Sequence, residues 1–278
     1  MCRQELICHI NVIFKNYPTS MPTSLEQEMI RAETKPIEWV VMGGAGKLAP
    51  ENTMAALIEG LARGVDHVWL DLQVSKDGVP FLFRDKRLER TTNARGIAHS
   101  LDWKHLKQLD ASDGHHVAAG HERIPALTEV LDWLQSADIR MILEIRATDR
   151  MLARLLPALA KACQQMPRAS EKLSFASGST TAVVRCGEVL RGKGRLLIVD
   201  KPKRPILLAA QEMGVGSVGC TAMNWTEKRV RNAREYDLEA TAFAVRNCND
   251  AKRLIKVGVK RLCIDDIDIK HRYDSSMS

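Results

Sequence analysis

The feature of this sequence that most constrains its fold is a repeated alternation of short β-branched runs with amphipathic stretches. Nine runs are typical of strands: Ile37–Met42, His67–Val74, Pro80–Arg84, Arg140–Ile145, Lys172–Ala176, Arg195–Val199, Ser217–Thr221, Thr241–Val245 and Arg261–Ile264. Strands that alternate with helical segments predict βαβ units and a parallel sheet. Because the alternation recurs so often within 278 residues, we predict an α/β fold closed into a TIM (β/α)8 barrel, which typically uses about 250 residues.

The amphipathic stretches supply the helices of these units. The expected helices are Asn52–Arg63, Leu127–Ser136, Met151–Met166, Thr180–Leu190, Pro205–Met213, Thr226–Tyr236 and Asn249–Val257. One connection departs from the rule, because only Ser75–Val79 separates the second strand from the third. A parallel crossover needs about a dozen residues or more, and Asp77-Gly78 is a hairpin turn signal. We therefore predict that these two strands are antiparallel, which leaves eight strands for the barrel.

The chain divides into three segments. Residues 1–36 lack periodicity and are rich in proline, so we expect a poorly ordered N-terminal extension. The barrel is expected over residues 37–270, followed by a C-terminal tail over 271–278. A polar insertion of about residues 85–123 follows the hairpin, with a short helix expected over Leu101–Leu109. Insertions that follow strand ends cover the catalytic face of such barrels.

The composition bounds the environment of the protein. No apolar run is long enough to cross a membrane, so we expect no transmembrane segment. The seven cysteines are scattered and none has CxxC spacing, which argues against a zinc site or a disulfide framework. Reduced thiols are typical of a cytoplasmic protein, and we expect that location.

The charge of the chain indicates its partners. A formal net charge of +7 favours anionic ligands. The densest basic segment, residues 185–204, is interpreted as a solvated face, and 5% aromatic residues are few for a nucleic-acid stacking surface. We therefore expect a small phosphorylated ligand and no nucleic acid. Nothing in the sequence points to a particular oligomeric state.

Short motifs follow one another in a recognisable order from about Val40 to Asp268. They include Pro50-Glu51-Asn52-Thr53, Ser75-Lys76-Asp77-Gly78-Val79-Pro80, Phe83-Arg84-Asp85, Glu89-Arg90-Thr91-Thr92-Asn93, Leu143-Glu144-Ile145-Arg146 and Gly258–Asp265. In order and spacing, the chain resembles the glycerophosphodiester phosphodiesterase family. The resemblance implies a barrel fold and an ancestral reaction that cleaves a glycerol phosphodiester to glycerol 3-phosphate and an alcohol.

The resemblance also implies catalytic groups that this chain lacks. The family uses two histidines as acid and base, three carboxylates around Mg²⁺ or Ca²⁺, and an arginine and a lysine for the phosphate. Met42 stands at the first histidine position and Arg84 at the second, while Trp69 replaces the glutamate of a ligand pair. The acids left as remnant metal ligands are Asp71, Glu144 and Glu51.

These replacements predict a catalytically impaired protein. Methionine transfers no proton and arginine stays protonated at physiological pH, whereas each positioned acid or base typically contributes roughly 10²–10⁴ in rate. Two carboxylates and an indole are a poor shell for a hard divalent ion. We therefore expect no cofactor, with Mg²⁺ or Ca²⁺ bound only if the remnant metal site survives.

The replacements together remove one anion and add a cation. We predict that Arg84, Arg146 and Lys47 bind a phosphate or phosphodiester group at a cationic barrel mouth, with Trp69 as a wall of the pocket. An equally weighted alternative is a collapsed site, in which Arg84 pairs with Asp71 and Arg146 with Glu144.

A second functional alternative is an active phosphoric diester hydrolase of glycerophospholipid metabolism with altered catalytic residues. The insertion contains His115, His116 and His121, any of which could replace a lost histidine. The same histidines, with Asp110 and Asp113, could also ligate a transition metal, although their spacing matches no known motif.

Overall fold

The computed structural model describes residues 36–112 and 121–276. The expectations for the N-terminal extension, apart from residue 36, and for His115, His116 and Asp113 concern residues outside these ranges. Residues 37–278 form one compact unit by their internal contacts.

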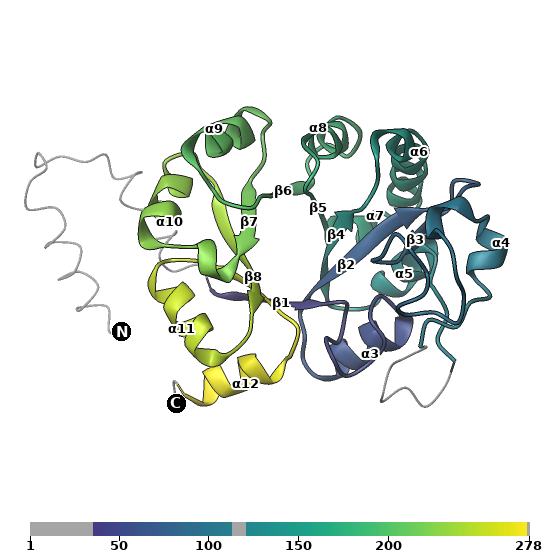
Figure 1. Ribbon diagram of the computed structural model, residues 1–278, viewed down its shortest axis with the longest axis horizontal. Coiled ribbons are helices and arrows are strands. Elements are labelled where there is room, and N and C mark those ends of the chain that lie inside the picture. Colours follow the sequence, from purple (N-terminus) through teal and green to yellow (C-terminus); the bar gives the residue numbers. More distant parts are fainter. Residues whose placement is uncertain (1–35, 113–120, 277–278) are drawn as a thin grey trace, which may run out of the picture. The chain divides into compact units, whose positions relative to one another are not determined.

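Nine strands of the described residues form one sheet. They are β1 (Glu38–Met42), β2 (His67–Val74), β3 (Pro80–Leu82), β4 (Arg140–Ile145), β5 (Leu173–Ser177), β6 (Gly194–Ile198), β7 (Ser217–Thr221), β8 (Glu239–Val245) and β9 (Arg261–Ile264). The hydrogen-bonded order is β1-β9-β8-β7-β6-β5-β4-β2-β3, and a further parallel pairing of β1 with β2 closes eight strands into a barrel (Figure 1). The predicted barrel is confirmed.

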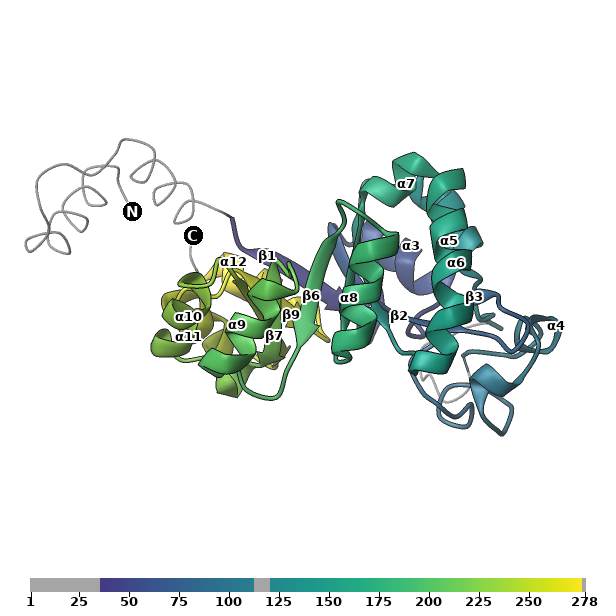
Figure 2. The same cartoon turned by 90° about the horizontal axis from the view of Figure 1, so that it is seen from above.

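Strand β3 stands outside the ring of eight strands. β3 pairs with β2 in the antiparallel direction, with Leu82 opposite Leu72, which confirms the predicted hairpin. Pro80–Leu82 is shorter than the expected strand, because after Leu82 the chain turns toward the insertion. β3 runs alongside the C-terminal end of β2, and helix α4 (Trp103–Leu106) lies on the same side of the unit (Figure 2).

Helices follow most of the barrel strands. They are α3 (Met54–Ala62), α5 (Leu127–Leu134), α6 (Asp149–Gln165), α8 (Thr180–Val189), α9 (Arg204–Glu212), α10 (Glu227–Arg234) and α11 (Cys248–Lys256). Each of these overlaps an expected helix. The elements that the periodicity did not predict are α7 (Pro167–Glu171), α12 (Asp268–Ser275) and the 3₁₀ turns η1 (Ala98–Ser100) and η2 (Ala222–Asn224).

Helix α12 occupies residues expected partly as a tail. It runs from Asp268 to Ser275, across the boundary expected at residue 270. The ring of Tyr273 packs on that of Trp39, with 5.4 Å between the ring centroids. Burial of two aromatic surfaces against each other stabilises this helix, which is too short and too polar to be predicted from periodicity.

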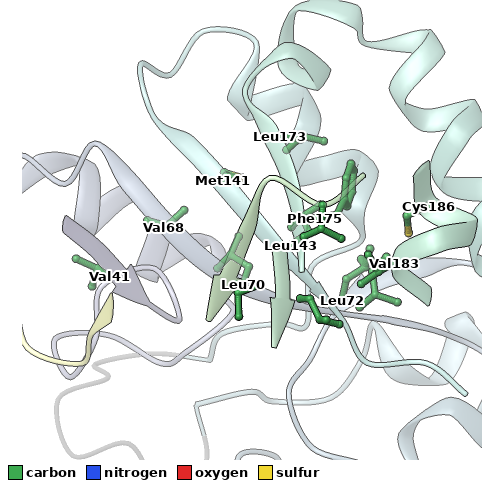
Figure 3. Close-up of a cluster of buried hydrophobic side chains, with 14 of the residues drawn as sticks. Val41, Val68, Leu70, Leu72, Met141, Leu143, Leu173, Phe175, Val183 and Cys186 are labelled. Carbon is green, nitrogen blue, oxygen red and sulfur yellow. The ribbon is translucent and has the colours of Figure 1, made fainter. Parts of the chain in front are cut away.

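Side chains of the strands alternate between the helix layer and the barrel interior. Figure 3 shows outward-facing residues of β2, β4 and β5 packed with two residues of α8: Val68, Leu70, Leu72, Leu143, Phe175, Val183 and Cys186. Complete burial of one such aliphatic or aromatic side chain is worth about 1.5–3 kcal/mol, so this layer is a major source of stability.

The barrel interior is arranged in layers, as in other (β/α)8 barrels. The layer at the N-terminal ends of the strands is polar and contains Glu38, His67, Arg140 and Arg261. The middle layer is an apolar cluster of Val40, Trp69, Ile142, Ala176, Leu196 and Cys263, with Met42, Ile198 and Phe243 packed against it. Above it, Asp71 of β2 stands opposite Glu144 of β4 in the strand register.

Five described cysteines are free thiols: Cys163, Cys186, Cys220, Cys248 and Cys263. Burial raises the pKa of Cys186 and of Cys220 to about 12, so these two are inert thiols at physiological pH.

Within the two described ranges, no helix is long and apolar enough to cross a bilayer.

Candidate functional site

A bridged pair of carboxylates lies at the C-terminal ends of β2 and β4. Nε of Arg146 donates to Oδ1 of Asp71 at 2.5 Å, and Nη2 of the same side chain lies 3.1 Å from Oε1 of Glu144. Arg146 directly follows β4, and its backbone N–H donates to the Leu72 carbonyl at 3.0 Å. The strand register therefore places one guanidinium between two acids.

The remaining oxygens of the two acids are also engaged. Nδ2 of Asn52 donates to Oδ2 of Asp71 at 3.0 Å, and Nε1 of Trp69 donates to Oε2 of Glu144 at 3.0 Å. All four carboxylate oxygens thus accept or approach a donor of the protein itself. Such a network satisfies the carboxylate oxygens without any added ion, while one guanidinium compensates the two charges in part.

Burial and charge shift the ionisation of this group. Burial raises the pKa of Glu144, and the neighbouring Asp71 carboxylate adds to the rise, while Arg146 opposes it. Burial works against the charge of Arg146, but the Asp71 and Glu144 carboxylates outweigh it and raise the pKa of that guanidinium. Arg146 is therefore a permanent cation in the site.

Asn52 positions Asp71 and was not singled out from the sequence. Besides the bond from Nδ2, its Oδ1 accepts the backbone N–H of Asp71 at 2.8 Å. Its backbone φ of 60° lies in the left-handed region, which asparagine tolerates better than most residues. The next residue, Thr53, caps α3 by accepting the N–H of Ala56. The Pro50-Glu51-Asn52-Thr53 motif is the sequence feature that could have pointed to this role of Asn52.

Trp69 lies beneath the mouth, contrary to its expected place in a pocket wall. It is 0% exposed, and the ring of Phe243 meets it edge-on with 5.0 Å between centroids. Phe243 is partly exposed and precedes Ala244, whose φ is 54°, at an irregularity of the β8–β9 pairing. Trp69 is buried because it belongs to the middle layer of the interior, where the large indole fills the space between strands.

Glu51 does not join the other two acids, contrary to the expected metal site. Nη1 of Arg90 donates to Oε2 of Glu51 at 3.2 Å, Nη2 of Arg90 donates to Oε1, and Nε of Arg90 donates to Asp85 at 2.5 Å. Opposite charge draws Glu51 toward the insertion. Among residues 36–112 and 121–276, no group of three or more His, Cys, Asp or Glu side chains is arranged to hold a metal ion.

The acids of this site therefore do not fit a divalent cation. Mg²⁺ and Ca²⁺ need several oxygen ligands, and the oxygens of Asp71 and Glu144 are already directed at Arg146, Asn52 and Trp69.

The hairpin of β2 and β3 places Arg84 near the two acids. The backbone N–H of Phe83 donates to the Asp71 carbonyl at 2.8 Å, and Arg84 follows it. Burial raises the pKa of Glu144, and the charge of Arg84 is near enough to oppose that rise. Arg84 is exposed and forms no ion pair with another described residue, nor does Lys47 after β1. The expected pairing of Arg84 with Asp71 is thus absent from the described part of the chain, and Arg146 pairs with both acids instead.

His121 of the insertion pairs with an acid. Nδ1 of His121 lies 2.5 Å from Oδ2 of Asp110, and the His121 side chain is 90% exposed. Hydrogen bonds from Ser112 and His121 lower the pKa of Asp110 to about 2. Asp110 therefore stays ionised and orients the imidazole of His121 through its contact with Nδ1.

Comparison with known proteins gives one consistent result. The sequence model of the Glycerophosphoryl diester phosphodiesterase family matches residues 43–269. A Caldanaerobacter subterraneus protein named glycerophosphodiester phosphodiesterase is 28% identical over 80% of this chain and 91% of its own length. An uncharacterized Bacillus subtilis protein is 35% identical over 37% of this chain, which corresponds to 42% of that protein.

A solved structure agrees at the level of the fold. An Oleispira antarctica phosphodiesterase, solved in complex with its product sn-glycerol-3-phosphate, matches with a TM-score of 0.78 and 21% identity over 88% of this chain and 98% of that one. The family model covers most of the barrel, from the residue after β1 into α12. This protein therefore belongs to the glycerophosphoryl diester phosphodiesterase family.

Proposed function

We propose that this family member binds a phosphate or phosphodiester group at the C-terminal mouth of its barrel and has lost most of the hydrolytic activity. The observation that carries the proposal is Arg84, an exposed guanidinium near buried Asp71 and half-buried Glu144, both of which already pair with Arg146. A guanidinium presents paired N–H donors that match two oxygens of a phosphate.

Two unpaired cations support an anionic ligand. Asp71 and Glu144 contribute two negative charges, which Arg146 compensates only in part, while Arg84 and Lys47 add two cations that have no partner among the described residues. The Glu51–Arg90–Asp85 group at the same end of the barrel adds two acids and one cation, so the charges balance and Arg84 and Lys47 are the cations left for a ligand. We expect these cations to hold the ligand without a divalent ion, because the acids do not fit one.

The loss of activity follows from the groups that replace the histidines. Met42 packs against the apolar cluster of the interior and has no titratable group, and Arg84 is no proton donor at physiological pH. A leaving alkoxide needs a proton from a group that titrates near neutrality. We therefore expect turnover of glycerol phosphodiesters to be slower than in intact relatives by several orders of magnitude.

Calorimetric titration with glycerol 3-phosphate in the presence of EDTA tests the proposal. We expect the purified protein to bind the ligand at millimolar concentration or below, and Arg84→Ala to weaken binding about tenfold, because one charge-assisted pair is worth about 1.5 kcal/mol. Arg87→Ala is the matched control, since Arg87 is an exposed arginine of the same insertion that pairs with Glu89. No binding at millimolar ligand, or equal loss in both variants, would contradict the proposal.

The second candidate is an active hydrolase of glycerophospholipid-derived substrates, and the Asp110–His121 pair favours it. A histidine oriented by an ionised carboxylate is a common general acid or base. Metal-dependent release of glycerol 3-phosphate from glycerophosphocholine would support it, provided that His121→Ala abolishes the release and His271→Ala, a change in an exposed histidine of α12, does not.

A further inference from the structure

A single apolar side chain stands out on the rim of the barrel. Met223 is 80% exposed, the most of any large hydrophobic residue in the described ranges. It lies in η2, which directly follows β7, so it belongs to the same end of the barrel as Arg84 and Arg146. The other exposed large hydrophobics, Ile58, Val189 and Leu208, lie on the outer helices.

The loop that carries Met223 is firmly held. Arg253 donates to the carbonyls of Ala222 at 2.9 Å and Trp225 at 3.1 Å, and Arg229 donates to that of Asn224 at 2.6 Å. Trp225 is fully buried, and its Nε1 donates to the Thr241 carbonyl. With both flanks anchored, Met223 cannot fold back into the interior without breaking these bonds.

Two lysines lie on the adjoining loop. Nδ2 of Asn224 donates to the Asp200 carbonyl at 2.7 Å, which ties the loop after β7 to the loop after β6. Lys201 and Lys203 in that second loop are exposed and form no ion pair with a described residue.

Other members of the basic segment are used internally. Lys193 donates to the Ser170 carbonyl, Arg195 to three carbonyls and Arg204 to Glu235. The two lysines on the rim therefore remain available to an external anion.

We infer that Lys201, Lys203 and Met223 form a docking surface for an anionic lipid bilayer. Ammonium groups near a bilayer are attracted to anionic headgroups, and a thioether beside them can enter the boundary between headgroups and acyl chains. Nucleic acid would use the lysines but not the methionine. Docking in this way would turn the barrel mouth toward the membrane, and it would occur whether or not the mouth binds phosphate.

Sedimentation of the full chain with vesicles tests the inference. We expect binding to vesicles of phosphatidylcholine that contain phosphatidylglycerol, weak binding to phosphatidylcholine alone, and a decline as salt is added. The double variant Lys201→Glu/Lys203→Glu should weaken partitioning more than tenfold, since each lysine near an anionic leaflet is worth about fivefold. Met223→Asp should weaken it several-fold.

The chain offers matched controls for both changes. Ile58→Asp introduces the same charge at an exposed apolar residue of α3, and Lys252→Glu/Lys256→Glu makes the same charge change on α11. Binding that is absent, or equal in the rim and control variants, overturns the inference. Titration of Met223→Asp with soluble glycerol 3-phosphate separates the two proposals, because the loss of docking should leave that binding unchanged.

Discussion

Nε of Arg146 and Oδ1 of Asp71 meet at 2.5 Å at the mouth of the barrel, where the family resemblance implies a divalent cation. The guanidinium supplies part of the positive charge that such an ion would supply, but it offers no open coordination position to a substrate. The guanidinium can therefore compensate the charge of the acids in part, but it cannot coordinate a substrate as a metal ion would. Removing the guanidinium tests this distinction.

Arg146→Ala should destabilise the protein and admit a metal ion. The variant leaves Asp71 and Glu144 buried without their cation, and we expect a loss of about 2 kcal/mol, less than for a fully buried pair because Arg146 is 34% exposed. Mg²⁺ should then stabilise the variant against urea while leaving the wild-type protein unchanged. Arg146→Lys, which keeps the charge, is the control. Equal stabilisation of the wild type by Mg²⁺ would show that the arginine does not exclude the ion.

Trp69→Phe should cost more stability than the same change at Trp225. Both indoles are fully buried, but Trp69 donates to the carboxylate of Glu144 and Trp225 to the backbone carbonyl of Thr241. Hydrogen bonds to charged groups are worth about 1.5–3 kcal/mol and neutral ones about 0.5–1.5 kcal/mol, so we expect a difference of about 1 kcal/mol in urea unfolding. Equal losses would mean that the bond to Glu144 contributes nothing beyond packing.

The barrel could be predicted because each of its elements carries a local signal. The bounds of β2, β4, β7 and β9 agree with the predicted runs, since each run is too short for a typical helix and is bounded by polar or turn-forming residues. Helix α12 was not predicted, because it depends on the contact of Tyr273 with Trp39, 234 positions earlier in the chain. Such a contact exists only after the barrel has closed.

The site was predictable in its residues but not in its pairing. The motif positions Asp71, Arg84 and Glu144 could be located from the resemblance to the family. That Arg146 would pair with both acids, and that Arg90 would attract Glu51 away, depends on side-chain reach across several strands and loops. A sequence pattern does not encode which of several cations meets which acid.

Stability should fall in mild acid because of His67. Its side chain is buried, its Nδ1 has no hydrogen-bond partner in the described structure, and Glu38, Arg140 and Arg261 surround it from β1, β4 and β9. Burial and the charge of Arg261 lower its pKa from 6.5 to about 4. Between these values the unfolded chain binds the proton more readily, so this contribution is complete above pH 6.5 and is lost as the pH falls to 4.

Urea unfolding across this pH range measures the effect. The shift corresponds to about 3 kcal/mol over the whole window. His67→Gln should flatten the dependence, whereas His271→Gln, which alters an exposed histidine, should leave it unchanged. An acid dependence that persists in His67→Gln would assign it to other groups, such as Glu38, whose own pKa is lowered and whose loss would begin at a lower pH.

Restoring the family residues at Met42, Arg84 and Trp69 should recover hydrolysis. In Met42→His/Arg84→His/Trp69→Glu the two histidines supply groups that titrate near neutrality, and a carboxylate replaces the indole that now bonds to Glu144. We expect Mg²⁺-dependent release of glycerol 3-phosphate from glycerophosphocholine to rise at least about 10²-fold over the wild type. The variant that restores only the two histidines is the control and should gain little, because the acids would still lack room for an ion. A folded triple variant with no turnover and no Mg²⁺ binding would contradict the view that these three positions account for the impairment.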